Sequence, residues 1–264
     1  MPERRRLARK ELNMWHDTIR FVRCVRETFD LRGPVHEYGM ATLAAPLAAT
    51  GNLSADAEAE GANARRADWT ESLDDLTHLP FASGTAGTVA CLNVLQHAAE
   101  PGAVAAEMIR LLAPGGVLLV CSCTGGQAAS ADLLWRPAPH AFQTLTAPLD
   151  ATLIGWQGPE GNPHGIYAIG AKAPVSPAFL ASLNRFLRLF RESLDHDRRA
   201  VSWIERVRAW LARWSRKSAT ARASRDYYQW RFVLHTPLAA DFRHEMLAAC
   251  FEPKKIGLRL DLAD

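Results

Sequence analysis

The sequence predicts an α/β protein built on a largely parallel sheet, and three consecutive segments carry that prediction. Residues 88–92 form an apolar run, and a segment opened by Pro101 then has helical spacing to about residue 113. Pro114-Gly115-Gly116 turns the chain into a second apolar run over residues 117–123. Two buried strands joined by a helix make a right-handed parallel unit, which needs helices on the faces of its sheet.

Composition sets the limits for this fold. The chain has 264 residues, with 48% hydrophobic and 22% charged residues, so it has the composition of an ordinary globular protein and is long enough to bury a full core. No apolar run approaches the ~20 residues of a membrane span, and the basic N-terminus lacks the apolar stretch of a signal peptide. We therefore expect free thiols in a reducing cytoplasm at Cys24, Cys91, Cys121, Cys123 and Cys250.

Further elements follow from periodicity and from proline and glycine. Residues 3–30 are predicted as an amphipathic helix, because Leu12, Trp15, Ile19 and Val22 recur at helical spacing. Additional strands are predicted at the ranges 35–39, 53–56, 65–68, 151–156 and 165–172. The prolines at positions 174 and 177 place a domain boundary near residue 175, which divides the chain into 1–175 and 176–264.

The segment 176–264 is predicted to be mainly helical. One apolar stripe consists of Leu183, Phe186, Leu187 and Phe190, and a second of Trp203, Val207, Trp210 and Trp214. Stripes this wide must be buried. They pack on the sheet, cap a binding site or pair two subunits as a homodimer; core packing is the default expectation.

The same segment is rich in arginine. Its cationic side chains outnumber its acids between residues 185 and 231, a distribution that suits an acidic substrate, nucleic acid or a membrane surface. The simpler interpretation is a solvated arginine-rich face, which we favour because charge alone is weak evidence for nucleic-acid binding.

Residues 79–123 have the sequence LPFASGTAGTVACLNVLQHAAEPGAVAAEMIRLLAPGGVLLVCSC. This block resembles the second half of the class I S-adenosylmethionine-dependent methyltransferases that act on small molecules, and the resemblance extends over about residues 33–172. It implies a Rossmann-like, doubly wound sheet of seven mostly parallel strands with an antiparallel last strand, here followed by a helical extension. It also implies a cytoplasmic biosynthetic enzyme that uses S-adenosyl-L-methionine, releases S-adenosyl-L-homocysteine and methylates a small-molecule acceptor.

The family's first glycine-rich turn, acid-x-Gly-x-Gly, matches this chain in part. Glu37 and Gly39 occupy the acid and first-glycine positions, and Met40 lies inside the turn. Ala41 replaces the second glycine, and its methyl group lies where the family brings backbone close to the cofactor. The resemblance thus implies cofactor contacts from Glu37, Gly39 and Met40, with an irregular loop.

The remaining cofactor contacts are carried over position by position. Asp56 lies about 20 residues after the turn, the spacing of an acid on the ribose hydroxyls; the alternative is an exposed acid beside two glutamates. Asp68 and Trp69 match the adenine acid and its neighbour, although Trp69 is nearly as well explained as a core residue. Leu92 and Asn93 end the fourth strand, where the family lines the methionine part of the cofactor.

Histidines are the candidate general bases, since a hydroxyl acceptor must lose a proton. We assign this role to His97 and His140, with a structural histidine as the competing interpretation of His97. Some relatives hold a metal with a Glu-x-x-Glu-His segment here. In this chain Asn93 and Gln96 stand in place of the two acids, and because amides are poor ligands for a hard cation, no metal is predicted.

Two alternatives stay open at this stage. One is a methyltransferase fold that has lost catalysis and serves as a partner-binding protein, which the irregular loop at Ala41 would permit. The other is a nucleic-acid methyltransferase that uses the basic tail.

Overall fold

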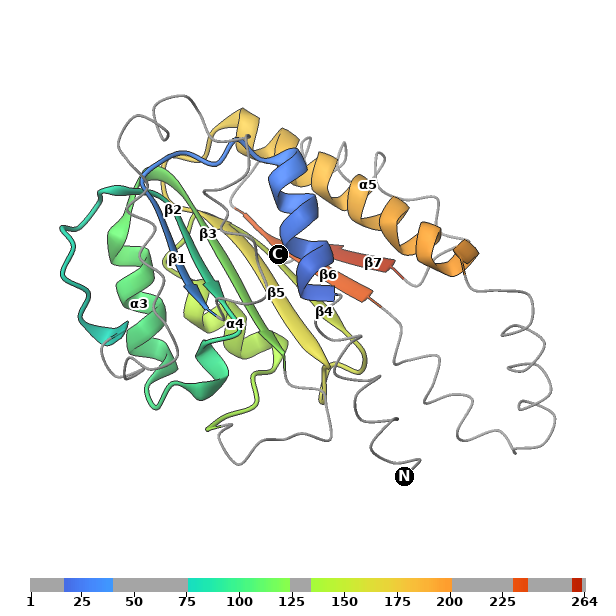
Figure 1. The fold of residues 1–264 in the computed structure, drawn as a ribbon, viewed down its shortest axis with the longest axis horizontal. Helices are drawn as coiled ribbons and strands as arrows, with labels where there is room; N and C mark the ends of the chain where they lie inside the picture. Colours follow the sequence, from blue (N-terminus) through green and yellow to red (C-terminus); the bar gives the residue numbers. More distant parts are fainter. Residues whose placement is uncertain (1–16, 40–75, 124–133, 201–229, 237–257, 263–264) are drawn as a thin grey trace.

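A single mixed sheet organises the chain. The structure is a computed structural model that describes residues 17–39, 76–123, 134–200, 230–236 and 258–262. Its sheet has the strand order β1-β2-β3-β5-β4-β6-β7 (Figure 1). The strands are β1 (Val35–Gly39), β2 (Ala86–Leu92), β3 (Leu112–Cys123), β4 (Ala151–Gln157), β5 (Gly165–Ala171), β6 (Trp230–His235) and β7 (Leu258–Leu262). The helices are η3 (Leu95–His97), α3 (Pro101–Leu111), α4 (Pro139–Thr146) and α5 (Pro177–Ala200), together with residues 17–28.

The parallel part of the sheet is the predicted one. β1 pairs with β2 and β2 with β3, both parallel, and α3 joins the last two strands. The turn predicted at residues 114–116 lies within β3, where Gly115 has φ +73° and donates its N–H to the carbonyl of Lys172 at 3.1 Å. The left-handed conformation of Gly115 therefore redirects the chain while the strand continues to pair.

Helices cover both faces of the sheet. One face packs against the helix over residues 17–28 and against α5, and its core includes Phe21, Phe186, Tyr167 and Trp230. The other face packs against η3, α3 and α4, and its core includes the fully buried Met108. In Figure 1 the blue helix of residues 17–28 and the orange α5 lie on the side of the sheet opposite α3 and α4.

The described parts of the C-terminal segment contain strands as well as the predicted helix. α5 is helical as expected, and its stripe of Leu183, Phe186, Leu187 and Phe190 is buried in the core of the same chain. The segment also supplies β6, antiparallel to β4, and β7, parallel to β6. The described sheet is consequently mixed rather than mostly parallel, and its antiparallel β5 is an inner strand. The boundary at residue 175 stays a prediction.

Other predictions meet the structure only in part. Residues 17–28 of the predicted N-terminal helix are helical, but Ile19 is 47% exposed while Phe21, Cys24 and Val25 are buried. The buried face is therefore rotated away from Ile19. The predicted strands at 53–56 and 65–68 and the second apolar stripe at 203–214 lie outside the described residues. No helix in the described ranges is long and apolar enough to cross a bilayer.

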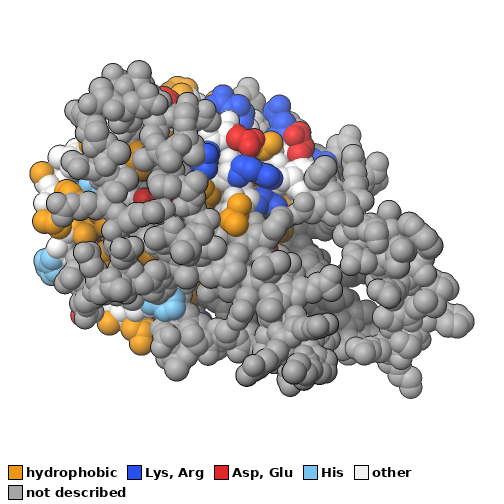
Figure 2. Space-filling model, in the orientation of Figure 1, with side chains coloured by type: hydrophobic (Ala, Val, Ile, Leu, Met, Phe, Trp, Pro, Cys, Tyr) orange, Lys and Arg blue, Asp and Glu red, His pale blue; other side chains and the backbone are white. Residues whose placement is uncertain are grey.

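The outer surface of helix 17–28 and α5 carries charges of both signs (Figure 2). Arginines and acids alternate there: Arg23, Glu27, Asp30, Arg185, Arg188 and Glu192 are all exposed. Arg185 also donates to the carbonyl of Thr28 at 3.0 Å, which fastens α5 to the end of the N-terminal helix. The surface shared by helix 17–28 and α5 therefore carries both acids and arginines.

Candidate functional site

The carboxyl ends of the parallel strands meet at one edge of the sheet. Gly39 at the end of β1 is paired with Leu92 at the end of β2, and Leu92 is paired with Cys121 of β3. Open α/β sheets bind their ligands outside this edge. Gly39, Leu92 and Asn93 of the predicted cofactor set therefore stand on neighbouring strands at the position where a ligand is expected.

Gly39 is required as glycine by its surroundings. Its φ is +155°, and a Cβ atom at this position would lie 2.4 Å from the carbonyl oxygen of Leu92. No side chain fits at that distance, so the backbones of β1 and β2 approach each other closely where β1 ends. Glu37, two residues earlier, is 8% exposed, and it shares a face of β1 with Val35, which packs towards helix 17–28.

Asn93 has an unusual backbone conformation. Its φ is 58°, and no other non-glycine residue in the described ranges has a positive φ. Asparagine tolerates this left-handed region better than most residues, but the conformation persists only where neighbouring contacts hold it. Here the N–H of Asn93 donates to the carbonyl of Cys121 at 2.8 Å, and the Cys121 thiol donates to Asn93 Oδ1 at 3.7 Å.

The helix over residues 17–28 contributes polar groups to the same edge. Asn93 Nδ2 donates to Thr18 Oγ1 at 3.5 Å, and Thr18 Oγ1 lies 3.4 Å from Cys123 Sγ. Asp17 forms an ion pair with Arg20 at 2.5 Å, and both side chains are largely buried. A buried charge needs such a partner. The edge of β2 and β3 is therefore lined by a neutralised pair and by uncharged donors and acceptors.

The thiols at this edge are not nucleophiles at neutral pH. Burial raises the pKa of Cys123 to about 11, and burial also raises the pKa of Cys121 well above its usual range. Desolvation is again the main cause of the raised pKa of Tyr167, with the nearby Cys123 and Asp17 adding to it. These groups stay protonated and act as hydrogen-bond partners, since only the thiolate is reactive.

On the other face of the sheet, polar groups after β2 are used in packing. Ser122 donates to Gln96 Oε1 at 2.7 Å, and the backbone carbonyl of Gln96 accepts from the N–H of Leu134 at 3.0 Å. Trp135 Nε1 donates to the carbonyl of Leu95. Gln96 and Trp135 thus fix the segment after β2 to the segment that follows β3.

The two histidines proposed as bases lie in different places. His97 is partly buried at the end of η3, and its N–H donates to the carbonyl of Val94 at 2.9 Å. His140 is exposed near the start of α4, on the sheet face opposite helix 17–28. His97 lies four residues after Asn93 in the sequence, and His140 belongs to a separate element, α4.

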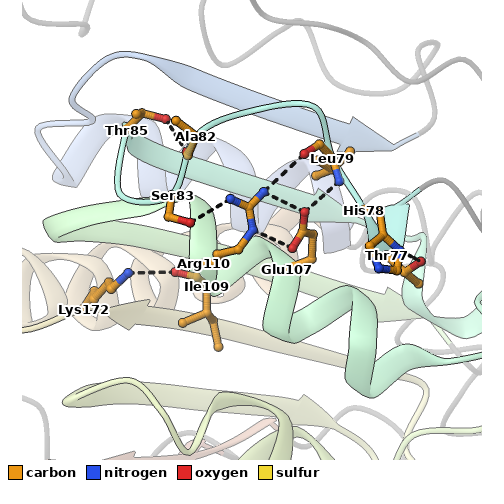
Figure 3. Close-up of polar contacts among 10 residues, drawn as sticks. All are labelled: Thr77, His78, Leu79, Ala82, Ser83, Thr85, Glu107, Ile109, Arg110 and Lys172. Carbon is orange, nitrogen blue, oxygen red and sulfur yellow. Dashed lines mark hydrogen bonds and ion pairs between the residues drawn. The ribbon is translucent and has the colours of Figure 1, made fainter.

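A further polar cluster holds the loop that enters β2 (Figure 3). Glu107 and Arg110, both on α3, form a two-pronged ion pair with distances of 2.7 Å. Glu107 Oε1 accepts from the N–H of Leu79 at 2.7 Å, and Arg110 donates to Leu79 O at 3.2 Å and to Ser83 Oγ at 2.9 Å. The Arg110 hydrogen bond lowers the pKa of Glu107. We call this set the α3 latch.

The structure brings together one part of the predicted site. Glu37, Gly39, Leu92 and Asn93 lie at or near the carboxyl edge of β1 and β2. Met40, Asp56, Asp68 and Trp69 lie outside the described residues. Sequence reasoning missed Asp17, Thr18 and Tyr167, which no motif marks: they come from a helix and a strand far apart in the sequence. Within the described ranges, no group of three His, Cys, Asp or Glu residues is placed to hold a metal ion.

Comparisons with known proteins indicate a methyltransferase domain in the middle of the chain. Residues 43–120 match a family model described as a methyltransferase domain. The fold is similar to that of a SAM-dependent methyltransferase of Thermotoga maritima, with 14% identity, a TM-score of 0.39 and coverage of 61% of this chain and 95% of the other. It is also similar to the 1,6-didemethyltoxoflavin-N1-methyltransferase of Burkholderia thailandensis, with 15% identity, a TM-score of 0.40 and coverage of 60% and 80%. None of the curated proteins matches the chain.

Residues 43–120 are thus assigned to a methyltransferase domain, which supports S-adenosylmethionine as the cofactor. The residues at the carboxyl edge fit that cofactor. Gly39 presents backbone without a side chain at the end of β1, and Asn93 is held in a left-handed conformation directly after the adjacent strand. The match over residues 43–120 supports the predicted family and cofactor, while the roles of the individual site residues stay predictions.

Proposed function

We propose that this protein transfers the methyl group of S-adenosylmethionine to a small-molecule acceptor at the carboxyl edge of β1, β2 and β3. The observation that supports this assignment most is the pairing of Gly39 with Leu92, directly before Asn93. Two neighbouring parallel strands end there in backbone with positive φ. A non-glycine residue held in such a conformation, as Asn93 is, is often found at active sites and ligand clamps.

The side chains have separable tasks in this proposal. S-adenosylmethionine supplies a methyl group already activated on a sulfonium. Glu37 and Asn93 orient the amino-acid part of the donor, and Asp56 and Asp68, with Trp69, hold the ribose and adenine. Alignment of donor and acceptor alone can lower the barrier by about 7–11 kcal/mol, so the protein's main work is positioning and exclusion of water. His97 accepts the acceptor's proton where the acceptor is a hydroxyl.

A small acceptor is supported by what surrounds the edge. Thr18 contacts both Asn93 and Cys123, so helix 17–28 covers the ends of β2 and β3 on its face of the sheet. The surface of that helix and α5 carries both acids and arginines. Binding of a nucleic-acid acceptor would favour an uncovered edge beside a uniformly positive face, because phosphate groups are negatively charged.

Calorimetric titration with S-adenosylhomocysteine tests the donor half of the site. Asp56→Asn removes a charged acceptor for the ribose hydroxyls, so we expect at least about tenfold weaker binding than for the wild type, equivalent to about 1.4 kcal/mol. The matched control is Asp150→Asn, because Asp150 is exposed where β4 begins, at the opposite edge. Equal affinities for Asp56→Asn and the wild type would remove Asp56 from the site.

The acceptor half is tested by following S-adenosylhomocysteine release with a panel of phenols, amines and thiols, beside total tRNA. Turnover with a panel compound and none with tRNA is the expected result. Turnover with tRNA alone would replace the small-molecule assignment with nucleic-acid methylation. Tight cofactor binding without turnover on either would point to the partner-binding alternative.

A further inference from the structure

One buried hydroxyl joins the N-terminal helix to the ends of two strands. Thr18 is 4% exposed, and its Oγ1 lies 3.5 Å from Asn93 Nδ2 and 3.4 Å from Cys123 Sγ. Thr18 also lies beside the Tyr167 side chain of β5, where it partly offsets the rise in the pKa of Tyr167. The Thr18 side chain thus contacts Asn93, beside the carboxyl end of β2, and Cys123, at the carboxyl end of β3. These two partners are 75 and 105 positions away from Thr18 in the sequence.

The amide of Asn93 is held from both sides. Its oxygen accepts from the Cys121 thiol and its nitrogen donates to Thr18. Asn93 is 5% exposed and has φ 58°, so the orientation of its side chain is set by these two partners rather than by solvent. Removal of one partner would free the amide to rotate and would leave a buried N–H₂ group without its acceptor.

The helix that carries Thr18 is itself firmly placed. Phe21, one turn later, lies 5.1 Å from the Tyr167 ring and 5.7 Å from the Phe186 ring of α5. These contacts fix the helix against the sheet independently of Thr18. The hydroxyl therefore arrives at Asn93 as part of a rigid surface, which is the arrangement needed to position a functional side chain.

We propose that Thr18 is a positioning residue of the methyl-transfer site: through the hydrogen bond to Asn93, helix 17–28 completes the donor site. This inference rests on the proposed function, because it takes Asn93 as a donor contact. Thr18 acts on the ligand through Asn93, and its own hydroxyl needs no contact with donor or acceptor. The helix is consequently part of the functional site although it lies outside the family match at residues 43–120.

A double-mutant cycle with S-adenosylhomocysteine as the titrant tests this inference. Thr18→Val keeps the shape of the side chain and removes the hydroxyl, so we expect about five- to tenfold weaker binding, and Thr18→Ser restores wild-type affinity. In an Asn93→Ala background, Thr18→Val should have no further effect, because the group it positions is absent. Thr28→Val is the matched control, since Thr28 lies on the same helix and its hydroxyl donates to the carbonyl of Cys24 at 2.7 Å.

The outcomes separate the two proposals. Failure of the wild type to bind would overturn the donor site and Thr18's role with it. Wild-type binding with unchanged affinity in Thr18→Val, or equal losses from Thr18→Val with and without Asn93, would overturn the role of Thr18 alone. Should Thr18→Val fail to fold by near-ultraviolet circular dichroism, Thr18→Ala and Thr18→Ser provide the same contrast: the hydroxyl-bearing variant must bind more tightly.

Discussion

The two faces of the sheet hold different polar networks. On the face covered by helix 17–28 and α5, buried polar side chains meet where the strands end, and Thr18 contacts both Asn93 and Cys123. On the face covered by α3 and α4, Glu107 and Arg110 fasten a loop, and Lys172 Nζ donates to the carbonyls of Ile109 and Leu112 near the end of α3.

The difference shows which polar groups are available for chemistry. The α3 latch satisfies its members within the protein, and Lys172 sits beside the partial negative charge that helix α3 carries at its end. The carboxyl-edge network instead holds Asn93 in a conformation that the sheet itself does not need. We therefore expect damage to the first set to lower stability alone, and damage to the second to lower cofactor affinity as well.

The largest effect on stability is expected when a buried phenylalanine on either face of the sheet is replaced by alanine. Phe186→Ala should lower the free energy of unfolding by about 3–5 kcal/mol, and Phe142→Ala, also fully buried, by a similar amount. Only Phe186 touches Phe21 of helix 17–28, so only Phe186→Ala should also weaken S-adenosylhomocysteine binding by the folded protein. Urea denaturation and calorimetry measure the two quantities. Equal affinity losses would erase the distinction between the faces.

The next largest effect concerns Gly39. Gly39→Ala places a methyl group against the Leu92 carbonyl in a backbone conformation unsuited to alanine, and we expect a loss of about 1–3 kcal/mol together with reduced cofactor affinity. Gly102→Ala is the control, because a Cβ at Gly102 meets nothing within 4 Å and alanine favours its helix. A Gly39→Ala protein as stable as the wild type would refute the close approach of β1 and β2.

Breaking the α3 latch should have a smaller and pH-dependent effect. Glu107→Gln is expected to cost about 1–2 kcal/mol at pH 7, towards the low end for a charged hydrogen bond because Arg110 is one-third exposed. Since Arg110 lowers the pKa of Glu107, the wild-type advantage is present above the unfolded pKa of about 4.3 and disappears as pH falls through the folded value. Unfolding at pH 7 and pH 3 measures this. A cofactor-affinity change in Glu107→Gln would contradict its purely structural role.

The smallest effect is expected at His36. Burial lowers the pKa of His36, whose ring lies 4.4 Å from that of Phe81. The native state therefore binds a proton less readily than the unfolded chain, and stability falls as pH drops below the unfolded pKa of about 6.5. His36→Leu should show a smaller decline in melting temperature between pH 7.5 and pH 5.5 than the wild type does. An identical decline would mean that His36 is not a source of the acid sensitivity.

The sequence was sufficient to predict those helices and strands that are marked by prolines, glycines or apolar runs. Pro101 opens α3, the glycines after Pro114 mark the change of direction, and unbroken apolar runs mark the buried strands β2 and β3. β6 was missed although a period of two was present: Trp230, Phe232 and Leu234 are buried, and the residues between them are less so. The arginine-rich helical pattern before it concealed that alternation.

The residues of the candidate site likewise fall into those that could be predicted from the sequence and those that could not. Gly39 and Asn93 lie in segments that resemble a family, so their positions could be predicted from the sequence. Thr18 could not, because its importance comes from contacts with Asn93 and Cys123 that only the folded chain creates. The exposed Ile19 shows the same limit: helical spacing predicts a periodicity, while packing against Tyr167 and Phe186 decides which side is buried.

The most direct test is a structure of the wild-type protein with S-adenosylhomocysteine bound. The account predicts the ligand's amino-acid part beside Gly39 and Asn93, under the end of helix 17–28, with the Thr18 hydroxyl still on the Asn93 amide. A ligand seated at another edge of the sheet, with Gly39 and Asn93 out of contact with it, would contradict the account.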